Sequence, residues 1–173
     1  MFKLKELDER FRLVARGARV LDLGAAPGSW SMYAAERAGP SGRVVAVDLQ
    51  EMAPLGDTVI VVRADVLDAE PPEAVLAAAP YDAVLSDMAP ATTGFRVSDQ
   101  ARSFELFMKA LAVATRLGKP GSHFAAKIFM SGDFPAAKRA VTENYEKCRV
   151  LKPEGTRSNS TEIYVVGLVL GGS

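Results

Sequence analysis

Residues 18–28 read Ala18-Arg19-Val20-Leu21-Asp22-Leu23-Gly24-Ala25-Ala26-Pro27-Gly28. The apolar and partly β-branched first half of this stretch is typical of a short buried strand. The glycines in the second half predict a tight turn, and Ser29 is a candidate N-cap for a helix that continues to about Ala38. A strand, a glycine turn and a helix, in that order, indicate the start of an α/β fold.

The same alternation extends in both directions from this unit. Leu4, Leu7, Phe11 and Val14 recur at helical spacing and predict an amphipathic helix over residues 3–14, in a basic leading element of about residues 3–16. Further helices are predicted at 71–79, with a proline in the first turn, and at 98–117 and 134–143. Further strands are predicted at 43–48, 59–62, 81–86, 122–128, 148–151 and 162–170.

These elements predict the fold class. Strands that alternate with helices form a mostly parallel sheet with helices on both faces. No helix separates the last two strands, so we expect them to form an antiparallel hairpin at one edge of the sheet. The prediction is an α/β, Rossmann-like fold with a seven-stranded sheet, an antiparallel last strand and a single domain over residues 1–173.

Composition excludes several classes of protein. No apolar run is long enough to span a membrane, and the first residues lack the apolar block of a signal peptide, so we expect a cytoplasmic protein. Cys148 is the single cysteine, which excludes an intrachain disulfide and a cysteine-based zinc site, and we expect a small buried side chain there. His123, the only histidine, is expected to pack or to cap rather than to catalyse. We expect a monomer.

The net charge is zero, which does not indicate a basic nucleic-acid binder. The basic residues nevertheless gather in two groups. These are Lys3, Lys5, Arg10, Arg12, Arg16 and Arg19 in the first segment, and Lys147, Arg149, Lys152 and Arg157 before the last strand. Each group is by default a solvated surface, and the two would form a phosphate-binding patch only if both lay on one side of the fold.

Aspartates lie at or just after the carboxyl ends of four of the predicted strands: Asp22, Asp48, Asp65 and Asp87. In open α/β sheets, ligands bind beyond the carboxyl ends of the strands. The turn that contains Gly24 and Gly28 matches neither the G-x-G-x-x-G pattern nor a Walker lysine pattern, but its glycines let a ligand approach the backbone.

This set of side chains suits S-adenosylmethionine, which carries a carboxylate, ribose hydroxyls, an adenine and a cationic sulfonium. Asp48 lies where ribose hydroxyls are usually accepted, and Asp65 can accept from the adenine amino group. Asp22 and Asp87 are expected near the cationic methionine portion, and Trp30 is expected to pack on the cofactor. A single aspartate at a strand end is a loop residue or a helix cap about as often as it is a ligand-binding residue. Four at successive strand ends favour a binding site.

Five short motifs occur in order along the chain: Phe2-Lys3-Leu4, Asp22-Leu-Gly-Ala-Ala-Pro-Gly-Ser-Trp30, Ser86-Asp-Met-Ala-Pro90, Ala126-Lys-Ile-Phe129 and Ser160-Thr-Glu-Ile-Tyr164. Together they resemble the motifs of the FtsJ/RrmJ family of RNA ribose 2′-O-methyltransferases. The resemblance covers essentially the whole chain and implies the methyltransferase version of the Rossmann-like fold. It also implies S-adenosylmethionine as cofactor, S-adenosylhomocysteine as product, no metal, and a uridine ribose of 23S rRNA as the acceptor.

The resemblance further assigns roles to individual residues. It implies a catalytic tetrad of Lys3, Asp87, Lys127 and Glu162. It implies cofactor contacts at Gly28, Trp30, Asp48, Asp65 and Asp87, to which the strand-end argument adds Asp22 and Gly24. Family members usually begin some tens of residues earlier, so Lys3 is expected to be loosely held, and the neutral charge predicts weak affinity for isolated RNA.

Lys127 is the candidate acceptor for the proton of the ribose hydroxyl. The sequence leaves a second role open, in which Lys127 stays charged and orients the hydroxyl or stabilises the developing alkoxide. In both cases, much of the rate should come from holding oxygen, methyl and sulfur in line.

The expected partner is RNA, in particular rRNA within the large ribosomal subunit, and we expect the two basic groups to flank the mouth of the active site. The alternatives are a 2′-O-methyltransferase for tRNA or another RNA, a small-molecule O-methyltransferase, and a non-catalytic cofactor-binding module. Base-amine methylation is not expected, because Asp87-Met88-Ala89-Pro90 differs from the Asn/Asp-Pro-Pro-aromatic motif. Pyrimidine C5 methylation is not expected, because Cys148 is far along the chain from that segment.

Overall fold

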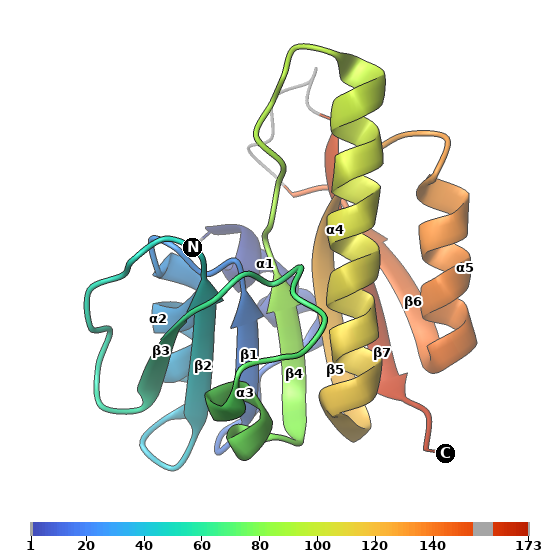
Figure 1. The fold of residues 1–173 in the computed structure, drawn as a ribbon. Helices are drawn as coiled ribbons and strands as arrows, with labels where there is room; N and C mark the ends of the chain where they lie inside the picture. Colours follow the sequence, from blue (N-terminus) through green and yellow to red (C-terminus); the bar gives the residue numbers. More distant parts are fainter. Residues whose placement is uncertain (1, 154–160, 173) are drawn as a thin grey trace.

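A computed structural model, which describes residues 2–153 and 161–172, contains a seven-stranded sheet between two layers of helices (Figure 1). The strands are β1 (Arg19–Leu23), β2 (Arg43–Asp48), β3 (Val59–Arg63), β4 (Tyr81–Ser86), β5 (Gly118–Phe129), β6 (Tyr145–Leu151) and β7 (Glu162–Leu170). The helices are α1 (Phe2–Phe11), α2 (Ser29–Ala38), α3 (Glu73–Ala78), α4 (Arg96–Leu117) and α5 (Phe134–Asn144). The predicted α/β, Rossmann-like fold class is confirmed.

The strands lie in the order β3-β2-β1-β4-β5-β7-β6. β7 runs antiparallel to both of its neighbours, whereas the pairs among β1 to β5 are parallel. The predicted antiparallel hairpin is therefore confirmed, with β7 inside the sheet and β6 at its edge. Because β7 is reversed, its first residue, Glu162, pairs with Phe129 at the carboxyl end of β5.

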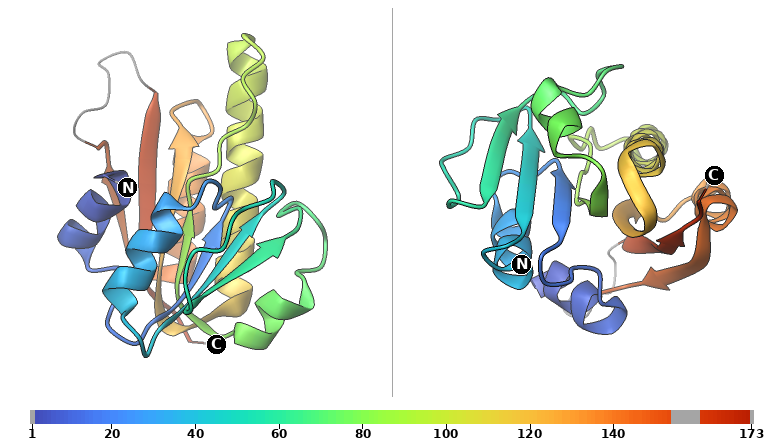
Figure 2. Two further views of the ribbon diagram at one scale, coloured as in Figure 1. Left: turned by 90° about the vertical axis from the view of Figure 1, so that its left-hand side faces the viewer. Right: turned by 90° about the horizontal axis from the view of Figure 1, so that it is seen from below.

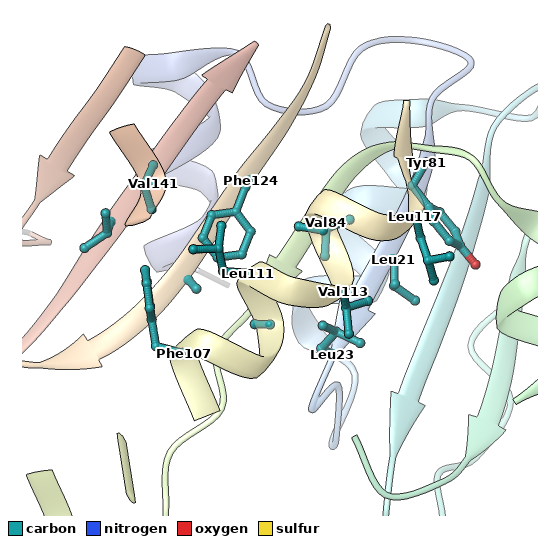
Figure 3. Close-up of a cluster of buried hydrophobic side chains, with 14 of the residues drawn as sticks. Leu21, Leu23, Tyr81, Val84, Phe107, Leu111, Val113, Leu117, Phe124 and Val141 are labelled. Atoms are coloured by element: carbon teal, nitrogen blue, oxygen red, sulfur yellow. The ribbon is translucent and has the colours of Figure 1, made fainter. Parts of the chain in front are cut away.

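Helices α1 and α2 cover one face of the sheet, and α3, α4 and α5 cover the other (Figure 2). On the second face, Val84 and Phe124 of the sheet pack with Phe107 and Leu111 of α4 (Figure 3). The rings of Phe107 and Phe124 meet edge to face, with centroids 5.7 Å apart. Each buried side chain of this size contributes about 1.5–3 kcal/mol, so the core holds the strand ends in fixed positions.

Helix α1 ends at Phe11, three residues before the predicted boundary, because the backbone leaves the helical conformation at Arg12. Arg12 has a φ of 55°, and its N–H donates to the carbonyl of Asp8 at 2.7 Å. The buried carboxylate of Asp8 accepts a further hydrogen bond from the N–H of Val14 at 2.9 Å. Val14 thereby enters the core, so its apolar character reflects burial after the helix rather than a further helical turn.

Two predicted helix starts are wrong. Ser29 is the first residue of α2 and not its N-cap, because Gly28 precedes the helix with a φ of 121° and no side-chain cap. Pro72 is the N-cap of α3 and does not lie in its first turn. Strands β5 and β6 begin earlier than predicted, at Gly118 and Tyr145, because most of their first residues are exposed and lack the apolar signal of a buried strand. The other boundaries agree to within two residues.

Helix α4 is the longest helix of the described residues. Its 22 residues span roughly 33 Å at about 1.5 Å per residue. Its first turns extend beyond the carboxyl ends of the strands (Figures 1 and 2). Neither α4 nor any other helix in the described ranges combines the length and apolar character needed to cross a membrane.

Candidate active site

A cavity of about 380 Å³ opens at the carboxyl ends of β1, β2 and β4, and we call it the strand-end cavity. It brings together four of the sequence-predicted residues: Gly24, Asp48, Asp65 and Asp87. Apolar side chains complete its wall, among them Val66, Met88 and Leu106. A preformed hollow with apolar walls and a few polar groups is typical of small-molecule sites.

The two glycines of the turn after β1 each leave room for a different neighbouring side chain. Gly24 has a φ of +72°, and a Cβ on it would lie 2.3 Å from Cγ of Met88, which lines the strand-end cavity. Gly28 has a φ of +121°, and a Cβ there would lie 2.8 Å from the side chain of Leu55. Gly24 therefore gives the cavity its shape, whereas Gly28 makes room for the loop that follows β2.

Backbone N–H groups hold the carboxylates of Asp48 and Asp65 in place. Asp48 accepts from the N–H groups of Ala26 at 2.9 Å and Gln50 at 2.8 Å, one on each oxygen. Asp65 accepts from the N–H of Leu67 at 2.9 Å. A carboxylate oxygen can accept more than one hydrogen bond, so both side chains keep capacity for hydroxyl or amino groups of a ligand.

Asp22, at the end of β1, is 1% exposed and accepts a hydrogen bond from the hydroxyl of Ser31 at 2.6 Å. Burial raises the pKa of Asp22 to about 7, the hydrogen bond from Ser31 opposes the rise, and the carboxylates of Asp87 and Asp48 add to it. A cation that entered beside these three carboxylates would favour the ionised form of Asp22.

The four residues of the predicted tetrad form one connected cluster. Nζ of Lys127 lies 3.3 Å from Oδ1 of Asp87 and 4.0 Å from Oε1 of Glu162. Nζ of Lys3 donates to the other carboxylate oxygen of Glu162 at 3.0 Å. The side chain of Lys127 is 9% exposed and that of Lys3 is 39% exposed, so the ion pairs of Lys127 are the better shielded from water.

Lys3 is connected to the rest of the site through its helix and one ion pair. It lies in the first turn of α1, where helix geometry and the ion pair with Glu162 fix its position. Asp8 anchors the same helix, because its buried carboxylate accepts from the hydroxyl of Tyr33 and from Nε of Arg37, each at 3.0 Å, both in α2. These contacts connect Lys3 to β7 and its helix to α2, and the expectation of a loosely held Lys3 stays a prediction.

Tyr164 is a further member of this site. It is the last residue of a motif noted in the sequence, but no role was predicted for it. It is fully buried, and its hydroxyl donates to Oδ1 of Asp87, the oxygen that Lys127 approaches. Burial and the neighbouring Asp87 raise the pKa of the Tyr164 hydroxyl far above its usual value. Its position two residues after Glu162 places it on the same face of β7, and this spacing was the signal available in the sequence.

Trp30 does not line the strand-end cavity. It is 5% exposed, and its ring packs on that of Tyr164 with centroids 5.7 Å apart. Trp30 therefore supports the tyrosine that contacts Asp87, rather than a wall of the cavity.

Among the described residues, only one member of each basic group is placed at the site edge of the sheet by its element, and the expectation that the groups flank the mouth of the site stays a prediction. Helix α1 begins beside Glu162, but the chain then runs to Arg19 at the opposite, amino end of β1. Lys147 and Arg149 lie along the edge strand β6, and only Lys152 follows its carboxyl end. Arg157 lies outside the described residues. The first group thus extends from Lys3 in the tetrad to Arg19 at the start of β1.

The other singled-out residues lie elsewhere. His123 lies inside β5, where its Nδ1 accepts from the N–H of Val169 at 3.2 Å, and burial lowers its pKa. Cys148 is partly buried in β6 and packs against the core, and burial raises the pKa of its thiol. Across residues 2–153 and 161–172, no group of three or more His, Cys, Asp and Glu side chains could hold a metal ion.

Comparison with known sequences gives a consistent set of matches. The family model described as FtsJ-like methyltransferase matches residues 1–170. A protein of Sorangium cellulosum named Ribosomal RNA large subunit methyltransferase E is 56% identical over 169 residues, which cover 97% of this chain and 79% of that protein. The protein of the same name from Syntrophobacter fumaroxidans is 45% identical over 172 residues, which cover 98% of this chain and 87% of that protein.

Solved structures share the fold. A Plasmodium falciparum protein provisionally described as a ribosomal RNA methyltransferase superposes with a TM-score of 0.86 at 21% identity, over 99% of this chain and 97% of that one. The fibrillarin pre-rRNA processing protein of Methanococcus jannaschii superposes with a TM-score of 0.67 at 19% identity, over 92% of this chain and 70% of that one.

Proposed function

We propose, because the chain belongs to the FtsJ-like methyltransferase family, that it transfers a methyl group from S-adenosylmethionine to RNA of the large ribosomal subunit. The observation that carries this proposal is the shared position of Asp87, which lines the strand-end cavity and also pairs with Lys127. A small-molecule site and a lysine–carboxylate cluster meet at this side chain, as a methyl donor and its acceptor must.

The strand-end cavity suits S-adenosylmethionine by the chemistry of its walls. Asp48 would hold the ribose hydroxyls, and Asp65 would accept from the adenine amino group. Apolar Val66, Met88 and Leu106 would contact the adenine ring. Asp22, behind the turn at Gly24, would face the cationic methionine portion together with Asp87. Trp30 and Gly28 would act by supporting the site rather than by lining it.

When bound, the sulfonium supplies a methyl group to a nucleophilic oxygen, and S-adenosylhomocysteine remains. We propose a ribose 2′-hydroxyl as that nucleophile, which must lose its proton as the carbon–oxygen bond forms and the carbon–sulfur bond breaks. In this proposal, Nζ of Lys127 takes this proton or holds the oxygen. Lys3 donates a hydrogen bond to Glu162, and Tyr164 donates one to Asp87. These two bonds orient the carboxylates around Lys127.

The proposed acceptor is a uridine of 23S rRNA, as the family resemblance implies, and such a substrate places the enzyme in the cytoplasm. The names of the relatives support rRNA rather than tRNA or a small molecule. We also propose that residues 1–173 act as one domain and as a monomer.

Transfer of labelled methyl groups tests the proposal. Wild-type protein is expected to label large-subunit particles or rRNA that lack the modification, and to leave tRNA and free nucleosides unlabelled. A 2′-O-methyl group blocks alkaline cleavage of the adjacent phosphodiester, so the label should stay in an alkali-resistant dinucleotide. Label recovered in mononucleotides would contradict the ribose assignment, and labelled tRNA would favour the alternative substrate.

A further inference from the structure

A second cavity, of about 460 Å³, lies on the other side of the tetrad, and we call it the α4 cavity. It is bounded by the start of α4, the end of β5 and the residues that lead into β7. Its polar wall residues include Thr92, Arg96, Gln100, Thr161 and Glu162, and Phe129 contributes an aromatic side. Its size is in the range of small-molecule sites.

The tetrad separates the two cavities. Asp87 lines the strand-end cavity and Glu162 lines the α4 cavity. Nζ of Lys127 lies between them, 3.3 Å from Asp87 and 4.0 Å from Glu162. A group held in the α4 cavity would therefore meet a group held in the strand-end cavity at Lys127.

The walls of the α4 cavity are fixed by hydrogen bonds. The carboxylate of Asp99 accepts from the backbone N–H of Thr93 at 3.0 Å and from its hydroxyl at 2.8 Å, which ties the loop after β4 to α4. Nε2 of Gln100 donates to the carbonyl of Met130 at 3.1 Å, which ties α4 to the end of β5. Gln100 is thus oriented, and its Oε1 makes no hydrogen bond within the part of the chain that the structure describes.

The rim carries groups that suit a nucleic-acid strand. Arg96 is exposed and forms no ion pair within residues 2–153 and 161–172. Phe95 and Val97, on either side of it, are 74% and 81% exposed. A guanidinium pairs well with a phosphate, and an exposed aromatic ring can stack on a base.

We propose that the α4 cavity receives the acceptor nucleotide, turned out of the RNA helix, with Arg96 on an adjacent phosphate and Gln100 on the edge of the base. This inference rests on the proposed function. It explains why α4 extends beyond the strands, since its first turns supply the wall and the rim of the cavity. In-line transfer needs a 2′-oxygen that approaches the methyl group from the side opposite the sulfur, and a nucleotide held in this cavity would present it there.

Steady-state kinetics on unmodified rRNA test the rim. Arg96→Ala is expected to raise KM for RNA about tenfold, as for the loss of a charge-assisted hydrogen bond, without changing the Kd for S-adenosylmethionine. Arg116→Ala is the matched control, because it removes the same charge from the far end of α4, where Arg116 pairs with Glu70 at 3.3 Å. An equal effect of both substitutions on KM, or no effect of Arg96→Ala, would overturn the assignment.

Photocrosslinking tests the cavity directly. A photoreactive amino acid in place of Gln100 is expected to link to the methylated nucleotide or its direct neighbour, as mapped by reverse-transcription stops. The same group in place of Arg116 should not link there. If the wild-type protein methylates rRNA but position 100 links elsewhere, the cavity assignment is wrong and the proposed function stands. If the wild-type protein methylates no rRNA, the proposed function itself fails.

Discussion

The strand-end cavity and the tetrad share Asp87 but differ in how their side chains are held. In the cavity, Asp48 and Asp65 each accept an N–H from a residue two positions further along the chain. In the tetrad, Lys3 and Glu162 pair across 159 positions, and Tyr164 reaches Asp87 across 77. The N–H of Ala26, 22 positions earlier, also donates to Asp48, so the cavity combines local turns with neighbouring strand ends, whereas the tetrad additionally requires β7 near the end of the chain. If this difference governs function, a substitution in the strand-end cavity should leave the tetrad intact, and a substitution in the tetrad should leave the cavity intact.

The largest expected effect is on turnover, from Lys127→Ala. Loss of a positioned acid–base group should lower kcat about 10²–10⁴-fold, and cofactor affinity should stay near normal because Lys127 does not line the strand-end cavity. Labelled methyl transfer and calorimetry measure the two quantities. Lys119→Ala is the matched control, since Lys119 is in the same strand but pairs with Asp82 at 3.0 Å, away from the tetrad. A Lys127→Ala protein that no longer bound cofactor would show that the tetrad and the strand-end cavity do not act separately.

The next largest expected effect is a dependence of the free energy of unfolding on pH, caused by the raised pKa of Asp22. Its pKa is about 7 in the folded protein, against 3.8 for an aspartate side chain free in water, so between these values the folded state retains a proton that the unfolded state has lost. The contribution of Asp22 is therefore most favourable at low pH and falls as pH rises towards 7, by about 1.4 kcal/mol per unit of pKa shift.

Asp22→Asn should remove this decline, and urea unfolding at a series of pH values would show it. Wild-type and variant curves of unfolding free energy against pH should converge at low pH and separate as pH approaches 7. Parallel curves would mean that Asp22 does not hold a proton in the folded state. Because a cation favours the ionised carboxylate, saturating S-adenosylmethionine should also flatten the wild-type curve.

A smaller effect is expected from Asp48→Ala. It removes the acceptor for two backbone N–H groups and for the cofactor hydroxyls, which should weaken S-adenosylmethionine binding by about 1–3 kcal/mol. Asp57→Ala, an exposed position in the following loop, is the control. Calorimetry measures both, and RNA crosslinking through position 100 should be unchanged in Asp48→Ala. Unaltered cofactor affinity would remove Asp48 from the site.

The smallest effect on stability is expected from Lys3→Ala. The ion pair with Glu162 is partly exposed, so the free energy of unfolding should change by no more than about 1 kcal/mol. Lys5→Ala, which removes the pair with Glu9 at 3.9 Å on the same helix, should change stability as little. Only Lys3→Ala should slow methyl transfer. Equal rates for both variants would show that Lys3 does not belong to the tetrad.

The same contrast explains what the sequence could predict. Asp48 and Asp65 end strands with clear apolar patterns, so their common edge followed from the alternation of elements. The tetrad could be anticipated only by resemblance, because no local pattern connects Lys3 with Glu162. A strand-end motif does not reveal which face of the turn the ring of Trp30 occupies, and here that ring packs on Tyr164. The α4 cavity escaped prediction because its walls come from three separate segments.

The reversed strand β7 has a consequence for synthesis of the chain. Among the described strands, β6 pairs only with β7, and β7 carries Glu162 and Tyr164. A nascent chain that has emerged only as far as β6 can have β1 to β5 in place, yet its sheet lacks an interior strand and its tetrad lacks a carboxylate. Closure of the sheet and completion of the proposed catalytic centre therefore both depend on β7, and a chain truncated before β7 should be inactive rather than partly active.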